Sequence, residues 1–84
     1  MKKLFVSLAL LFPLLGVAGP VNINTAEAET IAEELSGIGM AKAEAIVAYR
    51  NEFGPFDVAE ELVKVKGIGA KVLEENRSNI KVSD

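Results

Sequence analysis

A Gly-Ile-Gly triplet occurs twice in this chain of 84 residues, at 37–39 and again 30 residues later at 67–69. Each copy is flanked by two segments whose apolar residues recur at helical spacing, so each predicts a helix, a tight turn and a second helix. The first glycine of each triplet stands where a left-handed residue ends a helix, because glycine takes positive φ without a Cβ clash. The chain is therefore predicted to be all-α and built from two similar helical hairpins.

The remaining residues of the two turns have different predicted roles. Ile38 and Ile68 are bulky and are expected to fill the space between the helices. Gly39 and Gly69 leave bare backbone at the start of the next helix, where the first amides have no intrahelical acceptor and lie at the positive end of the helix dipole. Such a place suits an anion, and a phosphate in particular. A purely structural role as a compact helix corner remains the alternative.

The first 18 residues have the pattern of a secretory signal peptide. A basic start is followed by the apolar run Leu4–Leu15 and by the small residues Gly16–Ala18, which predicts cleavage after Ala18. The run is broken by Pro13 and falls short of the roughly 20 residues of a spanning helix. We therefore expect a signal peptide at 1–18, a single domain at 19–84, and no membrane association after cleavage.

The charge balance argues against a general attraction to nucleic acid. Nine basic residues stand against twelve acidic ones, and removal of Lys2 and Lys3 leaves seven against twelve, a net charge of −5. The chain has no Cys and no His, which excludes disulfides and disfavours zinc, so no cofactor is expected. It also offers no second domain to form a catalytic pocket, and an enzyme is not expected.

Four helices and a returning tail are predicted around the turns. The first helix begins near Thr25 or Ala26, capped by Asn24 with Glu27 or by Thr25 itself, and ends at Ser36. The second covers about 40–51 and the fourth about 70–76. The third begins at Asp57, paired with Glu60 as a cap, and repeats Val58, Leu62 and Val65 along one apolar face. Residues 79–82 are expected to pack back, and the aromatic core is assigned to Tyr49, Phe53 and Phe56.

Four segments together resemble the double helix-hairpin-helix domain of the ComEA family. They are VNINTA at 21–26, GIGMAKAEAI at 37–46, the connector FGPF at 53–56, and VKGIGAK at 65–71. The resemblance covers the chain from Val21 to about Val82. It implies two helix-hairpin-helix motifs packed as a pseudo-two-fold domain, with both turns on the same side.

The resemblance also implies a function and a site. Members with a signal peptide bind double-stranded DNA in the periplasm without sequence specificity, during DNA uptake in natural transformation, and DNA-uptake channel or pilus components are the further partners implied. Backbone amides of the turns hold phosphates and nearby lysines reinforce them. The positions implied here are Gly37, Ile38, Gly39, Met40, Lys42, Lys66, Gly67, Ile68, Gly69, Ala70 and Lys71.

The two turns differ in nearby charge. Within five residues, three glutamates oppose Lys42 at the first turn, a net of −2, whereas three lysines oppose Glu74 at the second, a net of +2. The second hairpin is therefore predicted to bind DNA more strongly. The acidic balance keeps a different function open, namely a protein-docking module like the lumenal extrinsic subunit of photosystem II, which shares this fold and which the chain distantly resembles.

Overall fold

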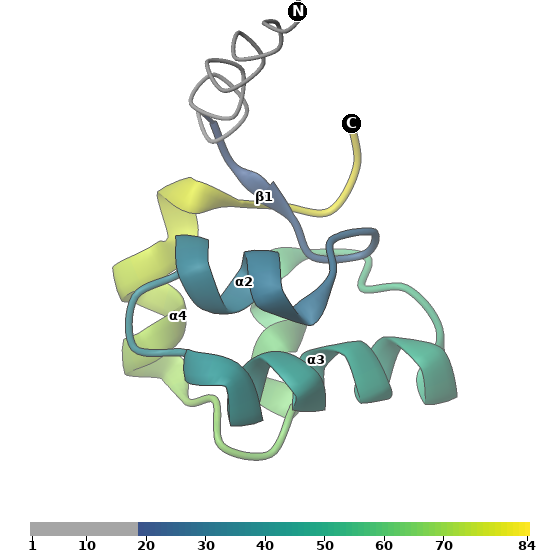
Figure 1. The fold of residues 1–84 in the computed structure, drawn as a ribbon. Coiled ribbons are helices and arrows are strands. Elements are labelled where there is room, and N and C mark those ends of the chain that lie inside the picture. The colour runs from purple at the N-terminus through teal and green to yellow at the C-terminus, as the bar shows by residue number, and fades with distance from the viewer. Residues whose placement is uncertain (1–18) are drawn as a thin grey trace, which may run out of the picture.

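The computed structural model describes residues 19–84, and the predicted signal peptide lies outside them. Seven short elements follow one another along this part of the chain (Figure 1). They are β1 (Val21–Asn22), α2 (Ala28–Glu34), α3 (Gly39–Phe53), η2 (Ala59–Lys64), α4 (Ala70–Asn76), η3 (Arg77–Asn79) and β2 (Ile80–Lys81), where η denotes a 3₁₀ helix. The domain is mostly helical, as the sequence predicted.

Two helical hairpins share one core. The elements α2 and α3 form the first hairpin, and η2 and α4 form the second, which packs beside it (Figure 1). Both turn isoleucines are buried, with 4% of Ile38 and 4% of Ile68 exposed, so their predicted role between the helices is confirmed. The other buried apolar residues are Val21, Ile23, Ile31, Leu35, Ala43, Ile46, Phe56, Leu62, Val65 and Leu73.

The two ends of the domain are joined by a small parallel sheet that the all-α prediction did not include. Val21 in β1 pairs with Ile80 in β2, and the Ile23 amide donates to the Lys81 carbonyl at 3.0 Å. The predicted return of the tail is thus confirmed, in the form of a strand. Because the core and both paired ends lie within residues 19–84, this part has the features of an independently folding domain.

The predicted cap of the first helix is wrong. The helix begins at Ala28, two residues later than the latest predicted start, and its N-terminal residue Glu27 makes no side-chain cap bond. Asn24 instead accepts from the Phe56 amide at 2.8 Å and donates to the carbonyls of Phe56 and Val82, each at 2.9 Å. Its side chain satisfies three backbone groups in this position, whereas a cap would satisfy one, so Asn24 holds the lead-in, connector and tail together.

The third helical segment also differs from prediction. It is a 3₁₀ helix whose extended N-cap is Val58, and the Asp57 amide accepts no cap from its own side chain but donates to the Glu61 carboxylate at 2.8 Å. Residues three apart share one side of a 3₁₀ helix, so Leu62 and Val65 are both buried. Val58 falls off that side and is 49% exposed, contrary to the predicted apolar face.

The aromatic assignment holds for Phe56 but fails for Phe53. Phe56 is 2% exposed and stacks on Tyr49, with ring centroids 5.3 Å apart. Phe53 is 66% exposed, although its ring lies 4.6 Å from that of Tyr49. The reason is helix length: α3 has 15 residues and α2 has seven, so the end of α3 extends beyond the helix that covers it (Figure 1).

Candidate nucleic-acid interface

The two Gly-Ile-Gly turns present the same pattern of exposure. Gly37 and Gly67 have φ of +74° and +95°, so each is the left-handed residue predicted to end a helix. After each of them comes a buried isoleucine and then two exposed residues, Gly39 and Met40 at the first turn and Gly69 and Ala70 at the second. The buried side chain anchors the turn from inside, which leaves the backbone around it open to solvent.

The second glycine of the triplet behaves differently at the two turns. Gly39 has φ of +68°, a left-handed conformation that favours glycine, whereas Gly69 has φ of −105° and ψ of −177°, which any residue adopts. A Cβ added at Gly69 would meet no atom within 4 Å. The fold therefore requires glycine at 39 but not at 69, and a requirement at 69 would have to come from outside the fold.

Exposed amides lie at the start of both following helices. The first residues of α3 and of α4 have no acceptor one turn earlier in their own helix, so their N–H groups are open to a ligand. Met40 and Ala70 are the first residues after the triplets and are exposed. The Ile68 amide is different, because it already donates to the Val65 carbonyl at 3.0 Å within the turn. Donors are thus available at both turns, mainly from the residues after the isoleucine.

Lys42 lies between the two turns. A Cβ on Gly67 would meet the Cγ and Cε atoms of Lys42 at 3.6 and 3.7 Å, and the Lys42 ammonium donates to the Gly37 carbonyl at 3.5 Å. The turns are therefore adjacent on one side of the domain, as the sequence predicted. The charge count by sequence assigned Lys42 to the first turn alone, whereas its position gives its charge to both.

The cations free of ion pairs are those beside the turns. Within residues 19–84, Lys42, Lys66 and Lys71 take part in no ion pair. The other four cations are engaged: Lys64 with Glu61 at 3.9 Å, Lys81 with Asp84 at 3.2 Å, Arg77 with Glu60 and Glu74, and Arg50 with the Ile23 carbonyl at 2.8 Å. The free positive charge is thus concentrated at the predicted site despite the acidic total.

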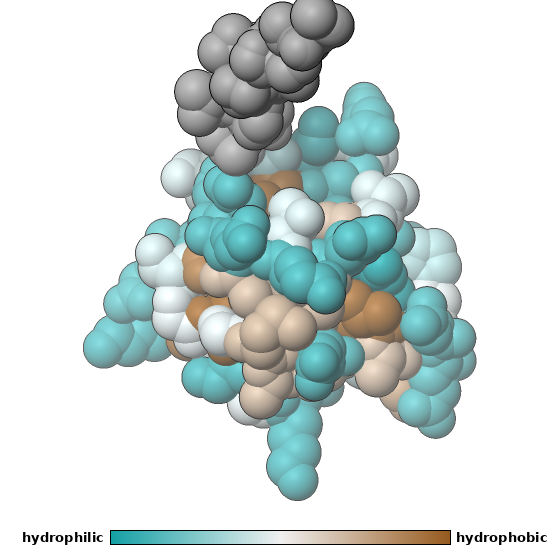
Figure 2. Space-filling model, viewed as in Figure 1, coloured by the Kyte–Doolittle hydropathy of each residue, from teal (hydrophilic) through white to brown (hydrophobic). Residues whose placement is uncertain are grey.

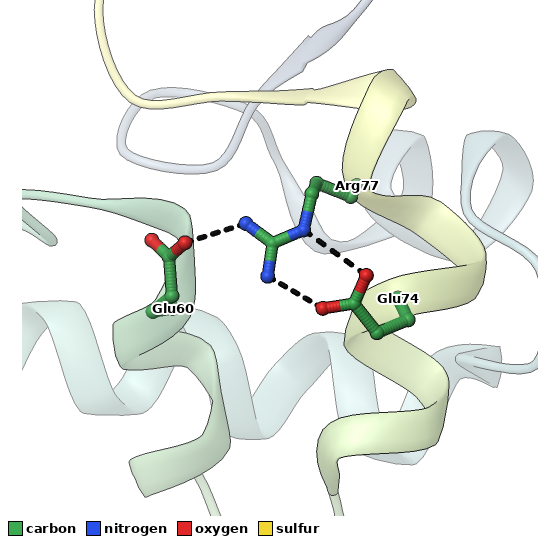
Figure 3. Close-up of polar contacts among 3 residues, drawn as sticks. All are labelled: Glu60, Glu74 and Arg77. Atoms are coloured by element: carbon green, nitrogen blue, oxygen red, sulfur yellow. Dashed lines mark hydrogen bonds and ion pairs between the residues drawn. The ribbon is translucent and has the colours of Figure 1, made fainter.

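An ion-pair network holds the second hairpin closed behind its turn (Figure 3). Arg77 forms two hydrogen bonds with the Glu74 carboxylate, at 2.6 and 3.2 Å, and a third with Glu60 of η2. Its guanidinium lowers the pKa of both carboxyl groups, and they raise the pKa of Arg77 in return. The spacing of Glu74 and Arg77 in sequence suits a helical pair, but nothing in the sequence indicated Glu60.

Two asparagines after the second turn hold the first hairpin. Asn76 is 4% exposed; its side chain accepts from the Ser36 amide at 2.8 Å and donates to the Ser36 carbonyl at 2.9 Å. Asn79 donates to the Glu34 carbonyl, also at 2.9 Å. The sequence analysis missed both residues. The repeat offered a signal, because Asn76 stands 30 residues after the buried Ile46 and is polar where its counterpart is apolar.

The remaining surface shows no competing chemical site in the part of the chain that the structure describes. No group of three or more His, Cys, Asp or Glu residues there is placed to hold a metal ion. No helix among these residues has both the length and the hydropathy needed to cross a bilayer. On the face seen in Figure 1, hydrophilic side chains surround smaller apolar areas (Figure 2).

Comparison with known proteins agrees with this geometry. The family model described as helix-hairpin-helix motif matches residues 17–81. An uncharacterized protein of Haemophilus influenzae is 53% identical over 64 residues, which are 76% of this chain and 57% of that protein. ComE operon protein 1 of Bacillus subtilis is 49% identical over 67 residues, which are 80% of this chain and 32% of that protein.

A third relative carries the domain as a small part of a larger protein. Endonuclease/exonuclease/phosphatase family domain-containing protein 1 of Rattus norvegicus is 44% identical over 62 residues, only 10% of its length. This chain thus spans between about a tenth and just over half of these relatives. It belongs to the helix-hairpin-helix family, as a domain of the DNA-binding type, and its resemblance to the ComEA family is confirmed by homology to ComE operon protein 1.

Proposed function

We propose that this chain binds double-stranded DNA without sequence preference through its two adjacent turns. The observation that carries the proposal is the distribution of free charge: the three lysines outside any ion pair in residues 19–84 all lie beside turns with exposed backbone amides. Amides and lysines are the groups that hold phosphates. The family and the relation to ComE operon protein 1 support the same function.

In this proposal each turn holds the backbone of the duplex. The amides at Gly39 and Met40 bind a phosphate at the first turn, and those at Gly69 and Ala70 bind another at the second. Lys42 contributes to both because it lies between them. Contacts of this kind position a protein on DNA but carry no sequence information, so binding is independent of base sequence.

The proposed setting is DNA uptake. The apolar beginning of the sequence supports secretion into the periplasm, and the likeness to ComE operon protein 1 supports a role in natural transformation. The secreted domain would occupy DNA that has entered and prevent it from slipping back, with channel or pilus components as its protein partners. No catalytic step is part of this proposal.

Salt dependence gives the first quantitative expectation. The small number of free lysines limits the phosphates neutralised to about two to four, so the affinity falls with salt at a log–log slope of about −2 to −4. This slope is shallow for a DNA-binding protein, because the net charge of −5 in residues 19–84 provides no long-range attraction.

A matched pair of charge reversals tests the site. Lys71→Glu and Lys81→Glu change the net charge equally, but Lys71 lies at the second turn and Lys81 lies in β2, paired with Asp84. We expect Lys71→Glu to weaken duplex binding about five- to tenfold and Lys81→Glu by no more than about twofold. Fluorescence anisotropy with a random-sequence duplex measures both. Equal losses would mean that overall charge, and not the turns, determines binding.

Protein docking is the second candidate function, and the net charge of −5 favours it. The same titration separates the two. A domain that docks on proteins would leave the labelled duplex unbound even at low salt, and its function would then have to be sought in a protein partner.

A further inference from the structure

An apolar groove lies between α3 and the end of η2, on the side of α3 next to its core-facing side. It encloses about 390 Å³ and its apolar wall is formed by Ala45, Ala48, Tyr49, Phe53 and Val65. Phe53 stands at its mouth with 66% of its surface exposed. A phenylalanine this exposed beside an apolar groove leaves both a projecting ring and a cavity for a ring uncovered.

We infer that a second copy of this chain occupies the groove, with the Phe53 ring of each copy inserted between α3 and η2 of the other. The patch is self-complementary in shape, because the projecting ring and the groove belong to the same surface. A two-fold arrangement of two copies uses both at once. An unrelated partner would have to supply only one of the two.

The charges along the groove support the same arrangement. Glu52 lies on the α3 side and Lys64 on the η2 side, and both line the groove. Glu52 has no ion-pair partner within residues 19–84, and Lys64 has only the long 3.9 Å pair with Glu61. When a two-fold axis passes between the grooves, each side of one copy faces the opposite side of the other. Glu52 of each copy can then pair with Lys64 of its partner.

The expected dimer is weak in solution. One buried phenylalanine contributes about 150–250 Å² per copy, far below the roughly 1,200–2,000 Å² of a stable interface. We therefore expect a dissociation constant on the order of 0.1 to 1 mM. Two copies bound side by side on one duplex would experience a local concentration in the millimolar range, which is enough to populate the contact. That last consequence rests on the proposed function, whereas the dimer itself does not.

Sedimentation equilibrium of residues 19–84 without DNA tests the dimer directly. Phe53→Ala should weaken self-association at least about tenfold, because it removes the inserted ring. Val58→Ala is the matched control, since Val58 is 49% exposed and lies outside the groove. We expect the control to remain within about twofold of the parent chain. A chain that stays monomeric up to about 2 mM, or equal effects of the two changes, would overturn the inference.

Charge reversal provides the second arm. Glu52→Lys and Lys64→Glu should each weaken the dimer about tenfold, because each creates two like-charge contacts across the axis. The double variant restores opposite charges and should return to within about threefold of the parent. A double variant no better than the single ones would contradict the two-fold pairing. Because no DNA is present, failure here is distinguishable from failure of the proposed DNA binding.

Discussion

Asn76 should be one of the most important polar residues for stability, and Asn76→Ala tests this. The side chain is 4% exposed and forms three hydrogen bonds, with the Ser36 amide at 2.8 Å and with the Ser36 and Val72 carbonyls at 2.9 Å. The first two connect the second hairpin to the turn of the first. Truncation removes all three bonds and leaves a cavity where water has limited access.

The size of the effect follows from these contacts. Three bonds at about 0.5–1.5 kcal/mol each give about 1.5–4.5 kcal/mol. Ser36 itself is exposed, so water can replace part of what is lost, and we expect a loss of about 2–3 kcal/mol. A domain of this size has a free energy of unfolding of only about 3–10 kcal/mol. The change should therefore lower the melting temperature by about 8–24 °C.

Urea denaturation followed by far-UV circular dichroism measures this loss. Asn79→Ala is the matched control, because Asn79 is half-buried and its side chain donates one hydrogen bond, to the Glu34 carbonyl at 2.9 Å. We expect the control to cost about 0.5–1.5 kcal/mol. An Asn76→Ala variant within about 0.5 kcal/mol of the parent, or one no less stable than the control, would refute the role given to Asn76.

Two further changes test the local accounts of the turns and of the Arg77 network. Gly39→Ala should destabilise the domain by about 1–2 kcal/mol because φ is +68°, whereas Gly69→Ala at φ of −105° should leave it unchanged or slightly more stable; similar urea midpoints for the two would show that the turns are not distinguished in this way. Arg77 holds the pKa of Glu60 and Glu74 below the ordinary value of 4.5, so the stability that it contributes is fully present above that pH and is lost as the pH falls through the lowered values. The urea midpoint of the parent should therefore fall more steeply than that of Arg77→Met between about pH 5 and pH 3, and parallel curves would contradict the network's role; the effect is small because these groups are exposed.

The repeat in the sequence predicted the parts of the fold that depend on local residue type. Glycine at 37 and 67 with positive φ, and buried isoleucines between them and the next helices, follow from what a helix-ending turn requires. The position of the turns beside each other also followed, because two hairpins can cover their apolar sides only by packing together. These predictions needed no knowledge of which polar side chain meets which backbone group.

The errors concern groups whose partners are distant in sequence. Asn24 matched a helix cap locally, but its partners at Phe56 and Val82 lie 32 and 58 residues away. Phe53 had the spacing of a core residue, yet the helix that would cover it is too short. Asn76 and the Glu60–Arg77 pair were missed for the same reason, since their partners come from the other hairpin or the other side of the turn. Sequence periodicity predicts which side of an element is apolar but not where its neighbour ends.

Backbone contact between the second turn and DNA is the central claim, and Gly69→Val tests it most directly. The fold accepts a side chain at 69, because φ is −105° and a Cβ meets nothing within 4 Å, so a loss of binding would reflect a blocked approach to the backbone. The measurement is fluorescence anisotropy of a labelled random-sequence duplex, at low and near-physiological salt, after circular dichroism has shown that the variant is folded. The account predicts at least about a tenfold loss of affinity relative to the parent, with Lys81→Glu near parental as the control. A folded Gly69→Val variant that binds the duplex as tightly as the parent would contradict it.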